Sequence, residues 1–167
     1  PGDTLIESRF TTGHDDVVLV TAEGMSIRFH EGGVRTMGRA AAGVRGIRLG
    51  KDDHVVALSI VSKDATLLVA GENGIGKRTD FDDYRVQSRG GKGIKTMKIT
   101  KKTGKVVGGL TVHEGDEIML ITVGGQMVRT SVDGVRQTGR NAQGVRLVNV
   151  DDKDRLQDIA PVVSTEK

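Results

Sequence analysis

The residues best suited to bind a ligand lie in a basic, glycine-rich stretch near the middle of the chain. From Tyr84 to Lys105 there are eight basic residues and no acidic one. The densest part of this stretch reads Gln87-Ser88-Arg89-Gly90-Gly91-Lys92-Gly93. Consecutive glycines allow backbone N–H groups to approach a ligand closely, while arginine and lysine supply charge for phosphate oxygens. The alternative is a loop whose glycines only provide unusual backbone angles, and the motif by itself leaves both interpretations open.

Other patterns argue against catalysis and cofactor binding. The segment from Gly71 to Lys77 fits the first seven positions of a phosphate-binding P-loop, but Arg78 stands where Mg²⁺ needs serine or threonine. The chain has no cysteine, and its four histidines lack metal-ligand spacing. The single tyrosine, Tyr84, aligns with valines in the repeats described next, so we expect it in the core. We therefore expect no catalytic residue, no metal and no cofactor in this chain.

An internal repeat organises the sequence. Two separate patterns each occur three times, with offsets of 50 and then 51 residues. The first pattern occupies Glu23–Arg28, Asn73–Arg78 and Gly124–Arg129, and the second occupies Gly38–Arg45, Ser88–Lys95 and Gly139–Arg146. Three aligned copies of so long a pattern indicate three tandem structural units.

Within each repeat the hydrophobic pattern is that of β-strands. Short aliphatic runs end at a glycine-containing turn and are followed by a second run, which predicts a hairpin. In the first repeat, Arg45–Leu49 alternates in period two and predicts a further strand. A last aliphatic run closes each repeat, at Val55–Val61, Val106–Val112 and Leu156–Val163. Four strands in about 50 residues are typical of a propeller-type blade.

The sequence therefore predicts an all-β, propeller-like fragment with three four-stranded blades. We expect the blades at residues 15–63, 64–114 and 115–163, followed by a tail at 164–167. Residues 1–14 are expected to be the end of a preceding blade, because Thr4–Phe10 matches the closing strand and would form an orphan strand. This arrangement predicts an open arc. Exposed blade edges are pairing hazards, so we also expect self-association.

Basic residues recur at equivalent places in the repeats, which suits phosphate contacts along a curved path. Only three phenylalanines and one tyrosine are present, which argues against a stacking platform for single strands. Duplex DNA is the expected partner. The candidate DNA-binding residues are Arg39, Arg45, Arg48, Arg89, Lys92, Lys95, Lys98, Arg140 and Arg146.

The heptapeptide from Gln87 to Gly93 resembles the box of the C-terminal DNA-wrapping domain in the A subunit of DNA gyrase. The resemblance extends over nearly the whole chain, including Gly43–Leu49 and Asn73–Thr79. It implies a β-pinwheel in which neighbouring blades trade a strand and a basic rim bends duplex DNA. It also implies that the parent enzyme, a bacterial cytoplasmic type II topoisomerase at the nucleoid, introduces negative supercoils. ATP and Mg²⁺ would be bound by its other domains. The protein partners would be the rest of the gyrase A subunit, together with the gyrase B subunit.

Two departures from this family's pattern affect the interpretation of the box. Ser88 occupies a position where the family has a basic residue, and one further repeat follows the box, whereas the family places it on the first blade. We therefore expect the last three blades of the domain, with a box-like relic in the penultimate one. The alternatives are the related subunit of topoisomerase IV and a propeller-like protein–protein scaffold.

Overall fold

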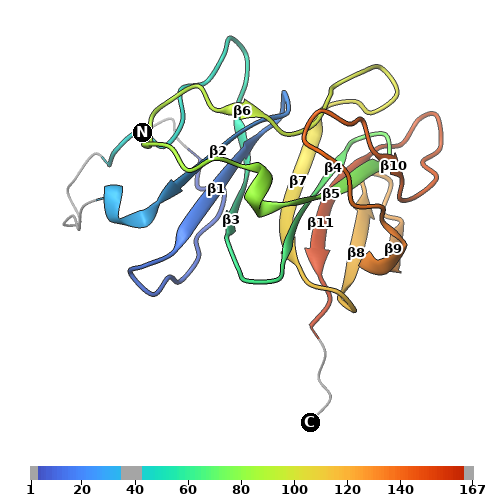
Figure 1. The fold of residues 1–167 in the computed structure, drawn as a ribbon. Coiled ribbons are helices and arrows are strands. Elements are labelled where there is room, and N and C mark those ends of the chain that lie inside the picture. The colour runs from blue at the N-terminus through green and yellow to red at the C-terminus, as the bar shows by residue number, and fades with distance from the viewer. Residues whose placement is uncertain (1–3, 35–42, 164–167) are drawn as a thin grey trace.

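The computed structural model describes residues 4–34 and 43–163, which form three antiparallel sheets. Figure 1 shows the sheets in chain order. The first has the order β3 (Val55–Ile60), β1 (Asp16–Thr21), β2 (Met25–His30) and β6 (Ile94–Lys95). The second has the order β10 (Val145–Arg146), β5 (Ile75–Asp80), β4 (Thr66–Gly71) and β7 (Val106–Val112). The third contains β11 (Leu156–Pro161), β8 (Glu117–Thr122) and β9 (Met127–Ser131).

The predicted hairpins are confirmed in all three repeats. β1 pairs with β2, β4 with β5 and β8 with β9. Each turn contains a glycine with positive φ, namely Gly24 (82°), Gly74 (85°) and Gly125 (92°), a conformation that costs other L-residues about 1–2 kcal/mol. A three-residue 3-10 helix follows each hairpin: η1 (Glu31–Gly33), η2 (Phe81–Asp83) and η3 (Val132–Gly134). None of these helices is long enough to cross a membrane.

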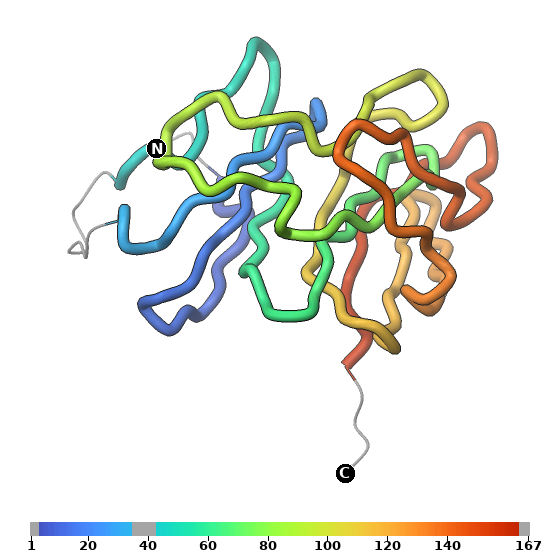
Figure 2. The backbone as a smooth tube through the Cα atoms, in the orientation of Figure 1, coloured from blue at the N-terminus to red at the C-terminus, as the bar shows by residue number. Residues whose placement is uncertain are grey.

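The fourth strand of the first two sheets comes from the following repeat. β6 pairs with β2, placing Lys95 opposite Met25, and β10 pairs with β5, placing Arg146 opposite Ile75. In Figure 2 the yellow-green and orange-red segments of the chain cross to the preceding blade in this way. Neighbouring blades therefore trade a strand, as the resemblance implied. The third sheet, predicted to have four strands, has three within the described residues, because its fourth strand would have to come from a further repeat.

The core is aliphatic and lies mainly between adjacent sheets. One cluster joins Val18 and Val20 of the first sheet to Leu67 and Val69 of the second, and a corresponding cluster joins the second sheet to the third. Tyr84 is buried in the first of these clusters, which confirms its expected core position. β7 packs against both β3 and β11, so the second sheet lies between the other two and the blades form an open arc.

The strand predicted at Arg45–Leu49 is absent from the structure. In the later repeats the corresponding strand is present but has only two residues, Ile94–Lys95 and Val145–Arg146. In the second repeat, the hydrogen-bond ladder between β6 and β2 ends after Lys95 because the next two backbone N–H groups share one acceptor. Thr96 N and Met97 N both donate to the Gly24 carbonyl, at 2.7 and 3.4 Å.

The orphan strand expected at Thr4–Phe10 is also absent from the structure. This segment contacts the inner strand β3 through a side chain, since the Leu58 backbone N–H donates to Glu7 Oε2 at 3.1 Å. A side-chain contact of this kind does not extend into a backbone ladder, so no strand forms.

Candidate nucleic-acid interface

The outermost strands of the first two sheets each carry one exposed basic residue. β6 and β10 are the edge strands farthest from the inner strands β3 and β7. In both, the aliphatic residue is half-buried and the following basic residue, Lys95 or Arg146, is exposed. The period-two alternation of a strand thus directs one side chain to the core and the next to the surface.

The box-like loop lies against the first repeat and uses several of its backbone groups there. Gln87 N donates to the Arg28 carbonyl at 2.7 Å, and Gly90 N donates to the Gly46 carbonyl at 2.6 Å. The Gly91 carbonyl accepts a hydrogen bond from Arg48 N at 2.6 Å. A Cβ at Gly93 (φ 79°) would overlap the Ser26 carbonyl. The N–H groups of Gln87 and Gly90 therefore serve the junction between blades, which favours, for these two groups, the structural interpretation that the sequence left open.

Arg89 and Arg140 bind the repeat that precedes their own. Arg89 Nε donates to the Gly33 carbonyl at 2.9 Å, and its Nη1 donates to the Arg45 carbonyl at 3.1 Å. Arg140 Nη1 donates to the Lys95 carbonyl at 2.9 Å. Each arginine is half-buried and so has a structural role that the sequence did not reveal. A guanidinium has five N–H donors, so donors remain in both side chains for a phosphate oxygen.

The other described candidates are exposed and have no carboxylate partner within the described residues. They are Arg45, Arg48, Lys92, Lys95, Lys98 and Arg146. By contrast, Arg28 is paired with Asp16, Lys105 with Glu23, and Arg129 with Glu117. Arg39 lies outside the described residues. We call the six exposed residues together with Arg89 and Arg140 the basic rim.

Two further exposed arginines were not among the candidate DNA-binding residues. Arg85 and Arg136 follow η2 and η3 in the segments that cross to the preceding blade. They occupy equivalent positions in the second and third repeats, directly after Tyr84 and Val135. This equivalence is visible in the sequence and was the signal that could have added them to the candidates.

The P-loop-like segment is the β4–β5 hairpin, and its lysine binds protein. Lys77 is fully buried, and its Nζ donates to the carbonyls of Gly139 and Arg140 at 2.8 and 2.6 Å. Burial, with a smaller contribution from the nearby Arg140 charge, lowers the pKa of Lys77 to about 8. The residue corresponding to Lys77 in the first repeat is Ile27.

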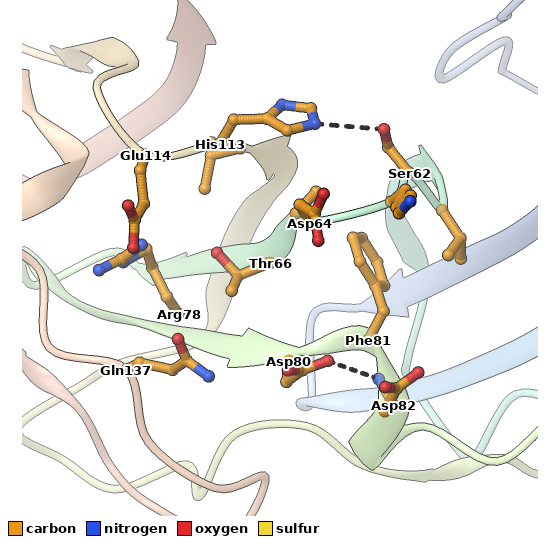
Figure 3. A pocket seen from close by; sticks show the side chains of 14 residues that line it. Ser62, Asp64, Thr66, Arg78, Asp80, Phe81, Asp82, His113, Glu114 and Gln137 are labelled. Atoms are coloured by element: carbon orange, nitrogen blue, oxygen red, sulfur yellow. Dashed lines mark hydrogen bonds between the residues drawn. The ribbon is translucent and has the colours of Figure 1, made fainter.

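A cleft of about 740 Å³ lies near the Asp80 end of β5, away from the end that pairs with β10. Figure 3 shows Ser62 facing His113 there, with Ser62 Oγ 3.2 Å from His113 Nε2, a pair that the sequence analysis missed. Asp116 Oδ2 accepts from the His113 backbone N–H at 2.8 Å and so caps the turn. No rim residue lines this cleft, so we assign it no part in DNA binding.

Comparison with known proteins connects these features to one family. The family model described as "DNA gyrase C-terminal domain, beta-propeller" matches residues 15–62, 65–113 and 116–162. The A subunit of DNA gyrase from Escherichia coli K12 is 44% identical over 168 residues, which cover 99% of this chain and 19% of that protein. The corresponding subunit of Aminobacterium colombiense is 42% identical over 165 residues, covering 99% of this chain and 20% of that protein. The chain thus spans about a fifth of the length of these relatives.

Solved structures agree with this relationship. A structure of the DNA gyrase A C-terminal domain matches 90% of this chain and 51% of its own, with 30% identity and a TM-score of 0.84. The C-terminal domain of DNA topoisomerase IV matches 91% of this chain and 48% of its own, with 25% identity and a TM-score of 0.85. With three family matches spread along its length, the chain belongs to the family of DNA gyrase C-terminal domains.

Proposed function

We propose that this chain binds duplex DNA along its basic rim without sequence specificity and bends it. The bending serves DNA gyrase, an ATP-dependent type II topoisomerase that introduces negative supercoils. One observation carries the proposal: basic side chains that form no ion pair within the described residues recur at equivalent places in successive repeats. Arg45 corresponds to Lys95 and Arg146, and Arg48 corresponds to Lys98.

The distribution of these side chains over several blades suits bending. Smooth bending of 20–30 base pairs costs on the order of 1–6 kcal/mol, and this cost must be offset by contacts at separated points along the DNA. Phosphate contacts from lysine and arginine contribute affinity without selecting a sequence. Strand cleavage and ATP hydrolysis would belong to other parts of the gyrase A subunit, or to the gyrase B subunit, in the bacterial cytoplasm.

Salt dependence tests whether charge dominates binding. Two or three contacts on each blade give about six phosphates, so the affinity should fall roughly 10³-fold between 50 and 200 mM salt. Fluorescence anisotropy with two unrelated 30-base-pair duplexes would measure the change and should give similar dissociation constants for both. Binding that is nearly independent of salt, or that strongly favours one sequence, would contradict the proposal and favour a protein–protein scaffold or a sequence-specific reader.

The triple variant Arg45→Ala, Lys95→Ala, Arg146→Ala should reduce the salt slope by about 2.7, because each lost phosphate contact removes about 0.9. Lys92→Ala alone should have a modest effect, since one contact among several is lost. Lys63→Ala is the matched control, because Lys63 is also exposed but lines the cleft near the other end of β5. An equal loss of binding in the control and the triple variant would disprove the placement of the interface.

Wrapping can be separated from simple binding with a nicked plasmid. Ligation of the nick in the presence of the chain should shift the linking number if the DNA path is bent around the rim. The triple variant should produce no shift at a concentration that still saturates the plasmid at low salt. If the wild type bound the plasmid without shifting its linking number, the proposed DNA binding would stand and the proposed bending would be wrong.

A further inference from the structure

One arginine recurs in the second hairpin strand of every repeat, and in the second repeat its usual acidic partner is missing. The arginines are Arg28, Arg78 and Arg129, and the partner positions in the first hairpin strand are Asp16, Thr66 and Glu117. The three hairpins have the same register, with each partner position two residues before the one opposite the arginine. Threonine at position 66 therefore removes a carboxylate from a geometry that the strands retain.

The acidic partner closes an ion pair in the first and third repeats. Arg28 Nε and Nη2 lie 2.9 and 2.8 Å from Asp16 Oδ2. Arg129 contacts Glu117 Oε2 through the same two nitrogens. These two repeats show that the site beside the arginine accepts a carboxylate, and that a guanidinium binds it through two nitrogens at once.

Arg78 keeps most of its donors free. Its Nε donates to the Val135 carbonyl of the next repeat at 2.9 Å. Its two Nη groups form no hydrogen bond or ion pair within the described residues. A guanidinium has five N–H donors, so four remain for an acceptor that this part of the chain does not supply.

The hydroxyl of Thr66 also has no partner. Thr66 Oγ1 is buried and forms no hydrogen bond within the described residues, although buried hydroxyls usually have one. Asp80 lies directly opposite Thr66 in the strand pair, but its Oδ1 accepts from the Asp82 backbone N–H at 2.9 Å and caps η2. That carboxylate therefore does not replace the missing partner of Arg78.

These groups line the cleft of about 740 Å³ near the Asp80 end of β5, and small-molecule sites typically have about 300–1,000 Å³. Figure 3 shows Arg78 and Gln137 at one end of the cleft and Asp82 toward the other. The charged residues of the lining are Lys63, Asp64, Arg78, Asp80, Asp82 and Glu114. None of them forms an ion pair within the described residues. The four carboxylates would repel a simple anion, whereas a ligand that carries both charges can satisfy both ends.

We propose that this cleft binds a small amino-carboxylate, whose carboxylate takes the place that an acidic side chain fills in the other repeats. The ligand's carboxylate accepts from the Nη groups of Arg78 and from the hydroxyl of Thr66, and its ammonium faces Asp64 and Asp80. Because Arg78 also binds the Val135 carbonyl, the ligand stabilises the junction between the second and third blades. This inference goes beyond DNA binding and does not depend on it, since no rim residue lines the cleft.

Titration with three probes of equal chain length tests the charge requirement. The probes are 6-aminohexanoate, hexanoate and hexylamine, added to the ¹⁵N-labelled chain and followed by NMR. 6-Aminohexanoate should bind saturably, move the Arg78 Nε resonance and shift only amides of the cleft. Hexanoate and hexylamine should each bind about tenfold more weakly or worse, because one charged hydrogen bond is lost. Saturating 6-aminohexanoate should also raise the unfolding temperature, as any ligand of the folded state does.

Variants at position 66 test the place of the carboxylate. Thr66→Glu restores the residue type of the other repeats, so the chain's own carboxylate should pair with Arg78 and weaken 6-aminohexanoate about tenfold or more. The fold should tolerate this change, because Glu117 stands at the equivalent position. Thr66→Val removes only the hydroxyl and should weaken binding roughly 2- to 10-fold. Thr4→Glu is the matched control, since it adds the same charge at an exposed residue outside the cleft, and it should bind like wild type.

Four results would overturn the proposal. They are no saturable binding of 6-aminohexanoate, equally tight binding of a probe with one charge, unchanged affinity in Thr66→Glu, and amide shifts centred outside the cleft. Glu114→Gln in the ligand-free chain provides one more check. It should leave the Arg78 Nε resonance in place, and a displaced resonance would mean that Glu114 already fills the carboxylate position.

Discussion

The two complete blade junctions have the same strand exchange but hold their crossing loops by different means. At the first junction, Arg89 binds the carbonyls of Gly33 and Arg45 from the rim, and the loop lies over the apolar side chain of Ile27, whose Cδ1 is 3.6 Å from a Cβ position at Gly91. At the second, Arg140 makes one bond of this kind, to the Lys95 carbonyl, while Lys77 binds the loop from beneath.

The same strand exchange therefore accommodates either an apolar side chain, Ile27, or a charged one, Lys77, at equivalent positions beneath the crossing loop. An apolar support adds no electrostatic cost and leaves the loop to be fixed by its arginine. A buried ammonium supplies two hydrogen bonds to loop carbonyls but loses hydration, and this loss lowers the pKa of Lys77 to about 8. The contribution of Lys77 to the stability of the second junction should therefore change at alkaline pH, whereas Ile27 adds no such dependence at the first junction.

The largest expected effect comes from the glycines that both junctions share. Gly93→Ala or Gly144→Ala should destabilise the fold by about 2–4 kcal/mol, because left-handed strain adds to an overlap with a backbone carbonyl. Gly43→Ala is the matched control and should cost about 1–2 kcal/mol, since only the strain applies. Denaturant unfolding of dilute, monomeric protein would measure all three. Equal losses would show that the close approach at the junctions contributes nothing.

Lys77→Met should separate the two junctions by their pH dependence. The folded chain releases the Lys77 proton near pH 8, whereas the unfolded chain keeps it to about 10.5. Between these values the unfolded state binds more protons, so the stability contribution of Lys77 rises with pH. The neutral amine retains two N–H donors for the two carbonyls, so these bonds survive.

The stability difference between wild type and Lys77→Met should therefore be about 1 kcal/mol at pH 7 and grow by about 2 kcal/mol by pH 10. Unfolding curves of both proteins across this range would measure it, and the subtraction removes the titration of other groups such as Tyr84. Ile27→Met is the control at the first junction and should show no such pH dependence. A constant difference between wild type and Lys77→Met would mean that the Lys77 pKa is not lowered.

The smallest expected effect distinguishes the two rim arginines. Arg89→Ala removes two hydrogen bonds to the preceding repeat and should cost about 1–2 kcal/mol, while Arg140→Ala removes one and should cost about 0.5–1 kcal/mol. Thermal unfolding in low salt without DNA would compare them. If Arg140→Ala were the more damaging, Lys77 would be too weak a support to hold the second loop.

Local sequence patterns were sufficient to predict the repeats and their hairpins. Alternating aliphatic residues and turn glycines such as Gly24 and Gly74 act over a few neighbouring residues, so their effect can be read directly from the chain. The same local pattern was misleading at Arg45–Leu49, because alternation predicts a strand only where a partner strand continues. The recurrence of basic residues identified the rim candidates, although Arg85 and Arg136, which also recur, were not counted among them.

The sequence by itself determined how many repeats the chain has, where their hairpins turn and which basic residues recur. Only the tertiary structure decided which sheet each two-residue strand enters, that Arg89 and Arg140 bind carbonyls of the preceding repeat, and that Lys77 lies buried beneath the next one. These contacts join residues 44 to 63 positions apart. Their partners are set by the path of the chain between blades, and no periodicity within one repeat specifies that path.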